Sequence, residues 1–310
     1  MKKKILVFGS FVADLMSRGP HLPTPGETVL CSLFQMGPGG KGFNQGVAAH
    51  KAGGDVTMVT KIGCDAFGDL ARSTMQSLGM DTAHLLVSDT VGTGAALVFV
   101  DENTSQNMIG ITPGACATIT EEDLCALEPV LAQSSYLLMQ MEVNLEANWR
   151  LLRLAKQHGV MTILNTAPAQ PLPDEIYRQL DMVTPNEVEA ELLTGVPVAD
   201  EAGAQRAADA LIAKGVKNAV ITLGSRGVFV ATAERAALIP VPRVEVLDTT
   251  GAGDAFNGGF VMALSEGRDL FEALRYGNAT GALSVTKKGT APAMPSREEI
   301  DRMVKKNYNI

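Results

Sequence analysis

Residues 248–260 read Asp-Thr-Thr-Gly-Ala-Gly-Asp-Ala-Phe-Asn-Gly-Gly-Phe. Two carboxylates, Asp248 and Asp254, flank a glycine-rich turn, and the apolar run at 255–264 predicts a helix directly behind it. The small residues at 251–253 would let a ligand approach backbone amides at the positive end of that helix, which suits an anion such as phosphate. Asp254 stands where it could take a proton from an attacking hydroxyl. A simple Asp N-cap after a turn is the competing interpretation.

The composition indicates an ordinary soluble globular protein. The chain has 310 residues, 46% of them apolar and 19% charged, which is enough to bury a large core. A net charge of −8 and a pI near 5.1 argue against nucleic acid or an anionic membrane as partner. The apolar run at 5–8 is too short for a signal peptide, and no stretch is long enough to span a bilayer. The four cysteines show no close pairing, which predicts reduced thiols in a cytoplasmic protein.

Short apolar runs alternate with longer helical patterns through most of the chain. This alternation predicts an α/β fold with a doubly wound, mostly parallel sheet flanked by helices. The expected strands lie at 5–9, 57–62, 136–140, 161–165, 182–184, 219–223 and 228–231. The expected helices lie near 42–53, 66–78, 121–132, 144–158, 187–194, 201–214, 254–266 and 269–285.

Two regions, 11–36 and 93–112, break this alternation. They carry β-like segments at 27–33, 95–100 and 107–111 with turn residues and no helix between them. We expect a small β-sheet lid inserted into a single domain that spans residues 1–310. A projecting sheet of this kind commonly closes over a site. Because it would be only marginally stable alone, its faces also predict a homodimer through the lid.

A second glycine cluster, Met-Gly-Pro-Gly-Gly-Lys-Gly-Phe-Asn-Gln-Gly, occupies residues 36–46. It predicts a flexible loop that enters a helix and presents Lys41 and Asn44. The Walker A consensus is missing, and the cluster does not follow a core strand in a dinucleotide-binding frame. A close backbone approach to a small polar ligand and a purely structural turn both remain open.

Polar residues follow several of the expected strands. Asp14 comes after the first strand, Glu142 follows the strand that ends near Met141, and the segments 184–189 and 222–227 follow two more. Ligands of α/β sheets bind at the carboxyl ends of the strands. Each cluster by itself is typical of a cap or a turn, but all of them would face the same edge of one sheet. The sequence therefore predicts one site at that edge.

These motifs together resemble the ribokinase-like sugar kinases of the PfkB carbohydrate kinase family, closest to its ribokinases and deoxyribokinases. Gly-Gly-Lys-Gly-x-Asn-Gln at 39–45 is similar to the first family signature. Asp-Thr-x-Gly-Ala-Gly-Asp at 248–254 is similar to the second, which is highly specific. Pro-Gly-Glu at 25–27 and the segments 184–187, 222–227 and 285–289 also fit in order, so the resemblance covers essentially the whole chain.

The resemblance implies transfer of the ATP γ-phosphoryl group to a pentose hydroxyl, usually O5, of D-ribose or 2-deoxy-D-ribose. Asp254 would be the base, and the anion hole would consist of the amides of Gly251, Ala252 and Gly253. The sugar would be held by Asp14, Gly40, Lys41, Asn44 and Glu142. Asn186 and Glu189 would lie by the phosphates and their Mg²⁺. The nucleotide would be lined by Thr222, Gly224, Ser225 and Gly227, with Asn278 near the adenine or ribose.

Two departures from the family pattern bear on specificity and activation. Val12 stands where ribokinases usually place an asparagine near the sugar hydroxyls, and deoxyribokinases also carry an apolar residue there. We therefore expect 2-deoxyribose to be accepted at least as well as ribose. An activating K⁺ would be held by Asp248, Thr250, Ser284, Lys287 and Gly289. Ala293 replaces a further contributor, which weakens that site.

Two alternatives remain beside a pentose kinase. A kinase for another small sugar or a nucleoside could use the same scaffold, because loops and a lid can be retuned without changing the fold. A sugar-binding regulatory protein could keep the fold without catalysis. Asp254 and the unbroken turn at 251–253 argue against the regulator, since a pure binder needs no base.

Overall fold

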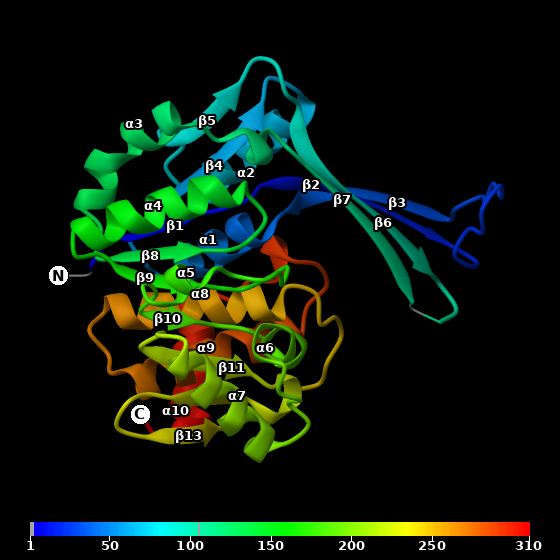
Figure 1. Cartoon of the computed structure of the whole chain (residues 1–310). Helices are drawn as coiled ribbons and strands as arrows, with labels where there is room; N and C mark the ends of the chain where they lie inside the picture. The colour runs from blue at the N-terminus through cyan, green and yellow to red at the C-terminus, as the bar shows by residue number, and fades with distance from the viewer. Residues whose placement is uncertain (1–2, 105) are drawn as a thin grey trace.

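The computed structural model describes residues 3–104 and 106–310, and its body is an α/β structure of three layers (Figure 1). The large sheet has the strand order β13-β12-β11-β10-β9-β8-β1-β4-β5. All neighbouring strands from β11 to β5 are parallel, whereas β12 runs antiparallel to both of its neighbours. Its strands are β1 (Ile5–Phe8), β4 (Val56–Gly63), β5 (Leu85–Ser88), β8 (Tyr136–Met139), β9 (Met161–Leu164), β10 (Met182–Val183), β11 (Asn218–Thr222), β12 (Val228–Ala231) and β13 (Ala236–Ile239).

Helices cover both faces of this sheet, because its central strands are apolar on both sides. In β1, Leu6 and Phe8 belong to one core, whereas Ile5 and Val7 belong to the other. The first core is closed by α3 (Glu121–Ala132), α4 (Leu145–Gln157), α5 (Asp174–Tyr177), α6 (Glu187–Thr194) and α7 (Glu201–Ala213). The second is closed by α1 (Lys41–Lys51), α2 (Ala66–Ser77), α8 (Ala252–Ser265), α9 (Leu270–Ser284) and α10 (Arg297–Tyr308).

A second sheet projects from one side of the body as a long twisted arm (Figure 1). Its strand order is β3-β2-β6-β7. Strand β2 pairs with β6 in parallel, and the two outer pairings are antiparallel. Its strands are β2 (Val12–Gly19), β3 (Leu33–Gly39), β6 (Thr93–Asp101) and β7 (Asn107–Gly114).

The predicted fold class is confirmed, and every expected strand and helix of the body is present within one or two residues. Sequence patterns missed the short strands β5 and β13, the single-turn helix α5 and the C-terminal helix α10. The start of α10 did carry a signal, because Ser296 and Glu299 form a capping box.

The expected strand at 27–33 is wrong for all but its last residue. Residues 24–27 form a turn in which the Glu27 amide donates to the Thr24 carbonyl and Gly26 has a φ of 87°. The Glu27 carboxylate also accepts from the Thr24 amide at 3.0 Å. These local bonds compete with a strand ladder, so the chain stays exposed here and pairs again only from Leu33.

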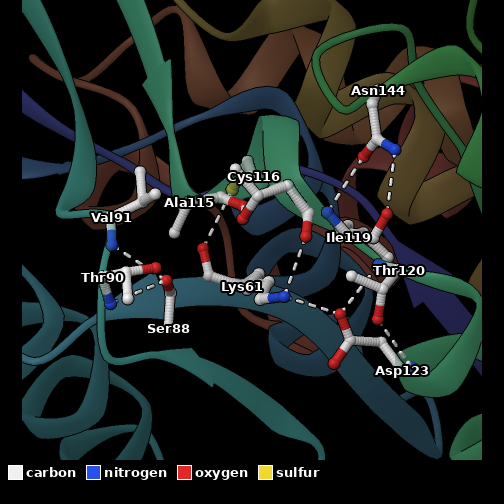
Figure 2. Close-up of polar contacts among 11 residues, drawn as sticks. Lys61, Ser88, Thr90, Val91, Ala115, Cys116, Ile119, Thr120, Asp123 and Asn144 are labelled. Carbon is white, nitrogen blue, oxygen red and sulfur yellow. Dashed lines mark hydrogen bonds and ion pairs between the residues drawn. The ribbon is translucent and has the colours of Figure 1, made fainter.

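The root of the second sheet is tied firmly to the body (Figure 2). Strand β7 leads into the 3₁₀ helix η1 (Ala115–Thr118) and then into α3. Lys61 of β4 lies against this connection and donates to the Thr118 carbonyl at 2.9 Å and to Asp123 Oδ2 at 2.6 Å. The Asn144 amide both donates to the Ile119 carbonyl, at 3.0 Å, and accepts from the Ile119 amide, at 3.2 Å.

Two further findings concern the predicted environment of the protein. All four cysteines are free thiols in this structure. In the part of the chain that the structure describes, no helix has the length and apolar character that crossing a membrane requires.

Candidate active site

Two cavities lie side by side at the carboxyl ends of the parallel strands. Lys41 connects them, because its side chain lines the first and its backbone amide donates to Glu142 of the second at 2.8 Å. The first, of about 190 Å³, is lined by Lys41, Asn165, Ala167, Thr184, Asn186, Glu189, Thr222, Thr249, Gly251, Ala252, Gly253, Asp254 and Asn257. The second, of about 280 Å³, is lined by Val12, Ile111, Pro113, Ala117, Met141, Glu142, Val143, Asn144 and Pro168.

Asp254 is the most buried carboxylate of the first cavity, with 8% of its surface exposed, and it lies in the first turn of α8. Its two oxygens accept hydrogen bonds from α1, one from Asn44 Nδ2 at 3.1 Å and one from Gln45 Nε2 at 2.9 Å. Burial raises the pKa of Asp254 to about 6, against the opposing effects of the Lys41 charge and the two amides. Asp254 is therefore ionised at neutral pH but close to its titration range, as suits a general base.

The turn before α8 has the geometry of an anion site. Gly251 is the N-cap with a φ of 74°, in the left-handed region that favours glycine. A Cβ on Gly253 would point into open space, so its backbone is accessible from the cavity. The Ala252 amide donates to the Thr249 carbonyl at 3.2 Å, and the Ala255 amide donates to the Gly251 carbonyl at 2.9 Å. The amides of Gly253 and Asp254 between them belong to the first turn, whose amides have no acceptor within the helix. These amides and the helix dipole favour a bound anion.

The glycine cluster at 36–46 is not the flexible loop that the sequence predicted. Gly37 and Gly39 lie in β3, Gly40 alone forms the turn with a φ of 92°, and α1 begins at Lys41. A Cβ on Gly39 would lie 2.3 Å from the Asp14 carboxylate oxygens, and one on Gly42 would lie 2.6 Å from the backbone of Gly9. The glycines therefore allow α1 to pack directly on the end of β1 and leave room for the Asp14 carboxylate.

The second cavity is lined by one carboxylate, Glu142, and mostly apolar groups. Glu142 Oε2 accepts from the Ser10 hydroxyl at 2.5 Å and from the Lys41 amide. Burial, together with the charges of Glu142 and Asp254, raises the pKa of Asp14 to about 6. Val12 is 3% exposed and lies two residues before Asp14 on β2, so the two side chains share a face of the strand.

Lys41 is the cation among these carboxylates. Burial lowers the pKa of its amine, but the negative charges of Asp254, Glu142 and Glu189 outweigh this effect and the net shift is upward. Lys41 is therefore charged throughout the physiological pH range. It lies where it can neutralise negative charge between Asp254 and Glu189.

Of the residues expected around a nucleotide, the structure brings some to the first cavity and leaves others outside. Asn186, Glu189 and Thr222 line the first cavity. Asn186 and Glu189 also form the capping box of α6, with reciprocal bonds of 2.9–3.0 Å. The turn after β11 carries Gly224, with a φ of 53°, and Gly227, with a φ of 105°, both in the left-handed region that favours glycine.

Ser225 lies in the 3₁₀ helix η2 (Gly224–Arg226), outside the linings of both cavities. The structure does not bring Asn278 to either lining. Its buried amide donates to the carbonyls of Ile239 at 3.0 Å and Pro240 at 3.3 Å, which fixes the strand end of β13 against α9.

The residues expected around K⁺ are close together. Asp248 Oδ1 accepts from the amide and hydroxyl of Thr250, and its Oδ2 accepts from the Gly289 amide at 3.0 Å. The Ser284 carbonyl accepts from the Lys287 amide at 3.1 Å. Burial acts to raise the pKa of Asp248, but the hydrogen bonds from Gly289 and Thr250 outweigh this effect. The net shift of the pKa is downward, so this carboxylate stays ionised. Ala293, in the 3₁₀ helix η3 (Ala291–Ala293), offers a buried methyl group.

Several polar residues at the site were missed by sequence reasoning. Asn165 directly follows β9, so the same rule that found Glu142 after β8 could have found it. Ser10, which binds Glu142, also follows a strand. Gln45 and Asn257 are buried in helices, where no local pattern distinguishes them from core positions.

Comparisons with known proteins agree with this geometry. The sequence pattern of the pfkB family carbohydrate kinases matches residues 2–297. A ribokinase of Haemophilus influenzae is 42% identical over 299 residues, covering 96% of this chain and 97% of that protein. A deoxyribokinase of Salmonella typhi is 36% identical, covering 98% and 99%. The structure of Arabidopsis thaliana ribokinase complexed with ribose and ATP superposes with a TM-score of 0.91 at 30% identity, covering 98% and 99%. The chain therefore belongs to the pfkB family of carbohydrate kinases.

Proposed function

We propose that this protein transfers the γ-phosphoryl group of ATP to the 5-hydroxyl of a pentose, D-ribose or 2-deoxy-D-ribose. The observation that carries the proposal is the position of Asp254, a buried carboxylate held by two amides at the amide-rich start of α8. Relatives named ribokinase and deoxyribokinase, and a similar ribokinase structure that contains ribose and ATP, support it.

In this proposal, Asp254 accepts the proton of the sugar hydroxyl as the hydroxyl attacks the phosphoryl group. A pKa of about 6 leaves it ionised at neutral pH yet basic enough to take the proton. The amides of Gly251, Ala252 and Gly253 stabilise the charge on the transferring group, the Ala252 amide in exchange for its 3.2 Å bond to the Thr249 carbonyl. Lys41 neutralises charge beside this group. Positioning and charge stabilisation of this kind are the main contributions that proteins make to phosphoryl transfer.

The sugar would lie between the two cavities, against Gly40, Lys41 and the carboxylates of Asp14 and Glu142. One buried atom supports this placement. Asn44 donates its amide nitrogen to Asp254, but its Oδ1 is buried and has no protein partner. A sugar hydroxyl that donates to this oxygen would satisfy it, because a buried polar atom without a partner is costly.

The nucleotide phosphates would extend from the α8 turn toward Asn186 and Thr222. Mg²⁺ would be held near Asn186 and Glu189 and would neutralise phosphate charge. The Glu189 oxygens already accept bonds from Asn186, which suits an ion that keeps several of its own waters. Gly224, Ser225, Gly227 and Asn278 would shape the outer nucleotide site, Asn278 through the loop that it fixes.

A monovalent cation, K⁺, would be held by the ionised Asp248 with carbonyl groups of Thr250, Ser284, Lys287 and Gly289. The site lies directly before the α8 turn, so the cation would order the anion hole. Because Ala293 supplies no side-chain oxygen, we expect weak K⁺ binding. Equal activity in K⁺ and in a large organic cation would reject this part of the proposal.

Val12 would set the choice between the two pentoses. Its buried side chain lines the second cavity and cannot bond a hydroxyl. We expect kcat/KM for 2-deoxy-D-ribose to equal or exceed that for D-ribose, and Val12→Asn to shift the ratio toward ribose. A strong ribose preference that Val12→Asn leaves unchanged would contradict this assignment.

A panel of pentoses, other small sugars and nucleosides with ATP tests the activity as a whole. We expect phosphorylation of a pentose that Asp254→Asn abolishes. Turnover of only another sugar or a nucleoside would support the second kinase activity, and binding of a sugar without turnover would support a regulator.

The second sheet would act as a lid over the sugar and as a dimer interface. Its strands carry exposed apolar side chains, among them Phe34 at 64%, Leu97 at 63% and Met108 at 55%. Such a surface is unusual on a monomer. Sedimentation analysis should show a dimer that Phe34→Asp weakens.

A further inference from the structure

We propose that Gln45 is a positioning residue for Asp254, acting through a closed ring of hydrogen bonds that joins the carboxylate to the turn before α8. The inference rests on the proposed function, in which Asp254 is the base. Gln45 is 0% exposed and belongs to the lining of neither cavity. Its influence on a reaction must therefore pass through the groups that it contacts.

One half of the ring runs from α1 to the ends of β9 and β10. Gln45 Nε2 donates to Asp254 Oδ1 at 2.9 Å and to Asn165 Oδ1 at 3.1 Å. Asn165 in turn donates from Nδ2 to the Thr184 carbonyl at 2.8 Å. The carboxylate of α8 is thus linked through one side chain to the carboxyl ends of two central strands.

The other half returns to α8. The Thr184 hydroxyl donates to Asn257 Oδ1 at 2.7 Å, and Asn257 Nδ2 donates to the Gly253 carbonyl at 2.8 Å. Gly253 precedes Asp254 in the chain, so the ring closes on the residue from which it began. The base and the backbone of the proposed anion hole are therefore held in one frame.

The direction of each bond in the ring is determined by groups that can only accept. The Thr184 carbonyl requires the nitrogen of Asn165, so Asn165 presents its oxygen to Gln45. Gln45 must then present its nitrogen to both Asn165 and Asp254, and its Oε1 accepts from Gln140 Nε2 at 2.7 Å. Both amide hydrogens of Gln45 are used, and Asp254 receives a donor that cannot rotate away.

This donor stabilises the ionised form of Asp254. Burial raises the pKa of Asp254, while Lys41 on α1 and then the Gln45 and Asn44 amides lower it. The charged groups that face the carboxylate are Lys41, which favours ionisation, and Glu142, which opposes it. Asp14 on β2 interacts with the same carboxylate, and its own pKa is raised in part by Asp254.

The test is the pH profile of kcat/KM in Gln45→Met, which keeps the side-chain length but removes the donor. The acidic limb should move up by about one pH unit. At pH 7, kcat should fall about tenfold, since a misplaced base costs transition-state stabilisation. The KM for the sugar should stay within about threefold, because uniform binding is unaffected. Gln45→Glu, an isostere that preserves packing, should move the limb further up by adding a second carboxyl group.

Gln140→Met is the matched control, because Gln140 is equally buried and loses its bond to Gln45 but not one to Asp254. It should lower thermal stability about as much as Gln45→Met and leave the acidic limb in place. An unmoved limb in folded Gln45→Met or Gln45→Glu, or an equal shift in Gln140→Met, overturns the inference. If Asp254→Asn keeps wild-type turnover, the proposed function itself fails. If Asp254→Asn is inactive and the acidic limb of the Gln45 variants is unmoved, only the positioning role of Gln45 fails.

Discussion

A single methyl group added at Gly258 should disable the site without touching a ligand. Gly258 lies one turn beyond Asp254 on α8, where that helix crosses α1. A Cβ at this position would lie 2.4 Å from the Ala48 Cβ and 2.7 Å from both the Ala49 amide nitrogen and the Gln45 carbonyl oxygen. Backbone atoms cannot rotate away, so Gly258→Ala must push the two helices apart.

The size of the effect follows from these distances. Carbon atoms in contact need about 3.5–4.0 Å, so the helices must separate by about 1 Å or more. Overpacking of this kind costs about 1–3 kcal/mol, and the better helix propensity of alanine returns about 1 kcal/mol. The bonds from Asn44 and Gln45 to Asp254, now 3.1 and 2.9 Å, would stretch beyond hydrogen-bond range. A misplacement of about 1 Å can lower activity about 100-fold.

The assay is kcat/KM for the preferred pentose at saturating ATP, together with a thermal melt. Gly46→Ala, on α1, is the control, because the one close contact of its added Cβ would be the Met58 sulfur at 2.8 Å, near the end of a flexible side chain on β4. We expect Gly258→Ala to lose about two orders of magnitude in kcat/KM and Gly46→Ala to stay near wild type. Wild-type kcat/KM in a folded Gly258→Ala protein would refute the claim that the α1–α8 approach positions the base.

Three further predictions concern charge. Because Asp254 must be ionised to act as base and its pKa is raised to about 6, kcat/KM should fall about tenfold per pH unit below that value; a flat profile from pH 5 to 8 would contradict this. The same shift of the Asp254 pKa affects stability. Below pH 3.8 the carboxyl is protonated in both the folded and the unfolded protein. As the pH rises from there toward about 6, the unfolded chain ionises first, so the free energy of unfolding falls across that range. Relative to wild type, Asp254→Asn should therefore gain up to about 3 kcal/mol in unfolding free energy between pH 4 and pH 7, and denaturant melts that show no pH-dependent difference would count against it. Lys61→Met should cost about 1–3 kcal/mol, because it removes the donor shared by the Thr118 carbonyl and Asp123 at the root of the second sheet, while Asp123 keeps its bond from the Thr120 amide; an unchanged melting temperature would show that the ion pair contributes nothing.

The body of the fold could be predicted because its strands are short and apolar on both faces. Runs such as 5–8 and 136–139 are apolar and fully buried, and the second is followed directly by the amphipathic helix α4. The second sheet was harder, because most residues of its outer strands β3 and β7 are exposed and its boundaries depend on local turn bonds. The Glu27 carboxylate accepts a hydrogen bond from the nearby Thr24 amide, which favours a turn where residue types alone favoured the start of a strand.

The strand-end rule brought Asp14, Glu142, Asn186 and Thr222 to one edge, and the structure places all four beside the two cavities or their shared border. The same rule applied to β9 finds Asn165. The rule does not apply to Asn278, which lies in α9 and was assigned only by resemblance; its side chain holds the end of β13. Site residues at strand ends can thus be predicted from the topology of the sheet. A site residue inside a helix can be predicted only when the packing of that helix is known.

Gln45 shows why the remaining residues could not be predicted. Its partners Gln140, Asn165 and Asp254 lie 95, 120 and 209 positions away in the chain, at the ends of two strands and on another helix. What brings them together is the close crossing of α1 and α8, and that crossing depends on the missing side chain of Gly258. A glycine in a helix weakens it by about 1 kcal/mol relative to alanine, so local propensity opposes the residue that the site requires. Where a local preference is violated inside a well-packed element, the cause lies in a contact distant in sequence, and here that contact holds the proposed base.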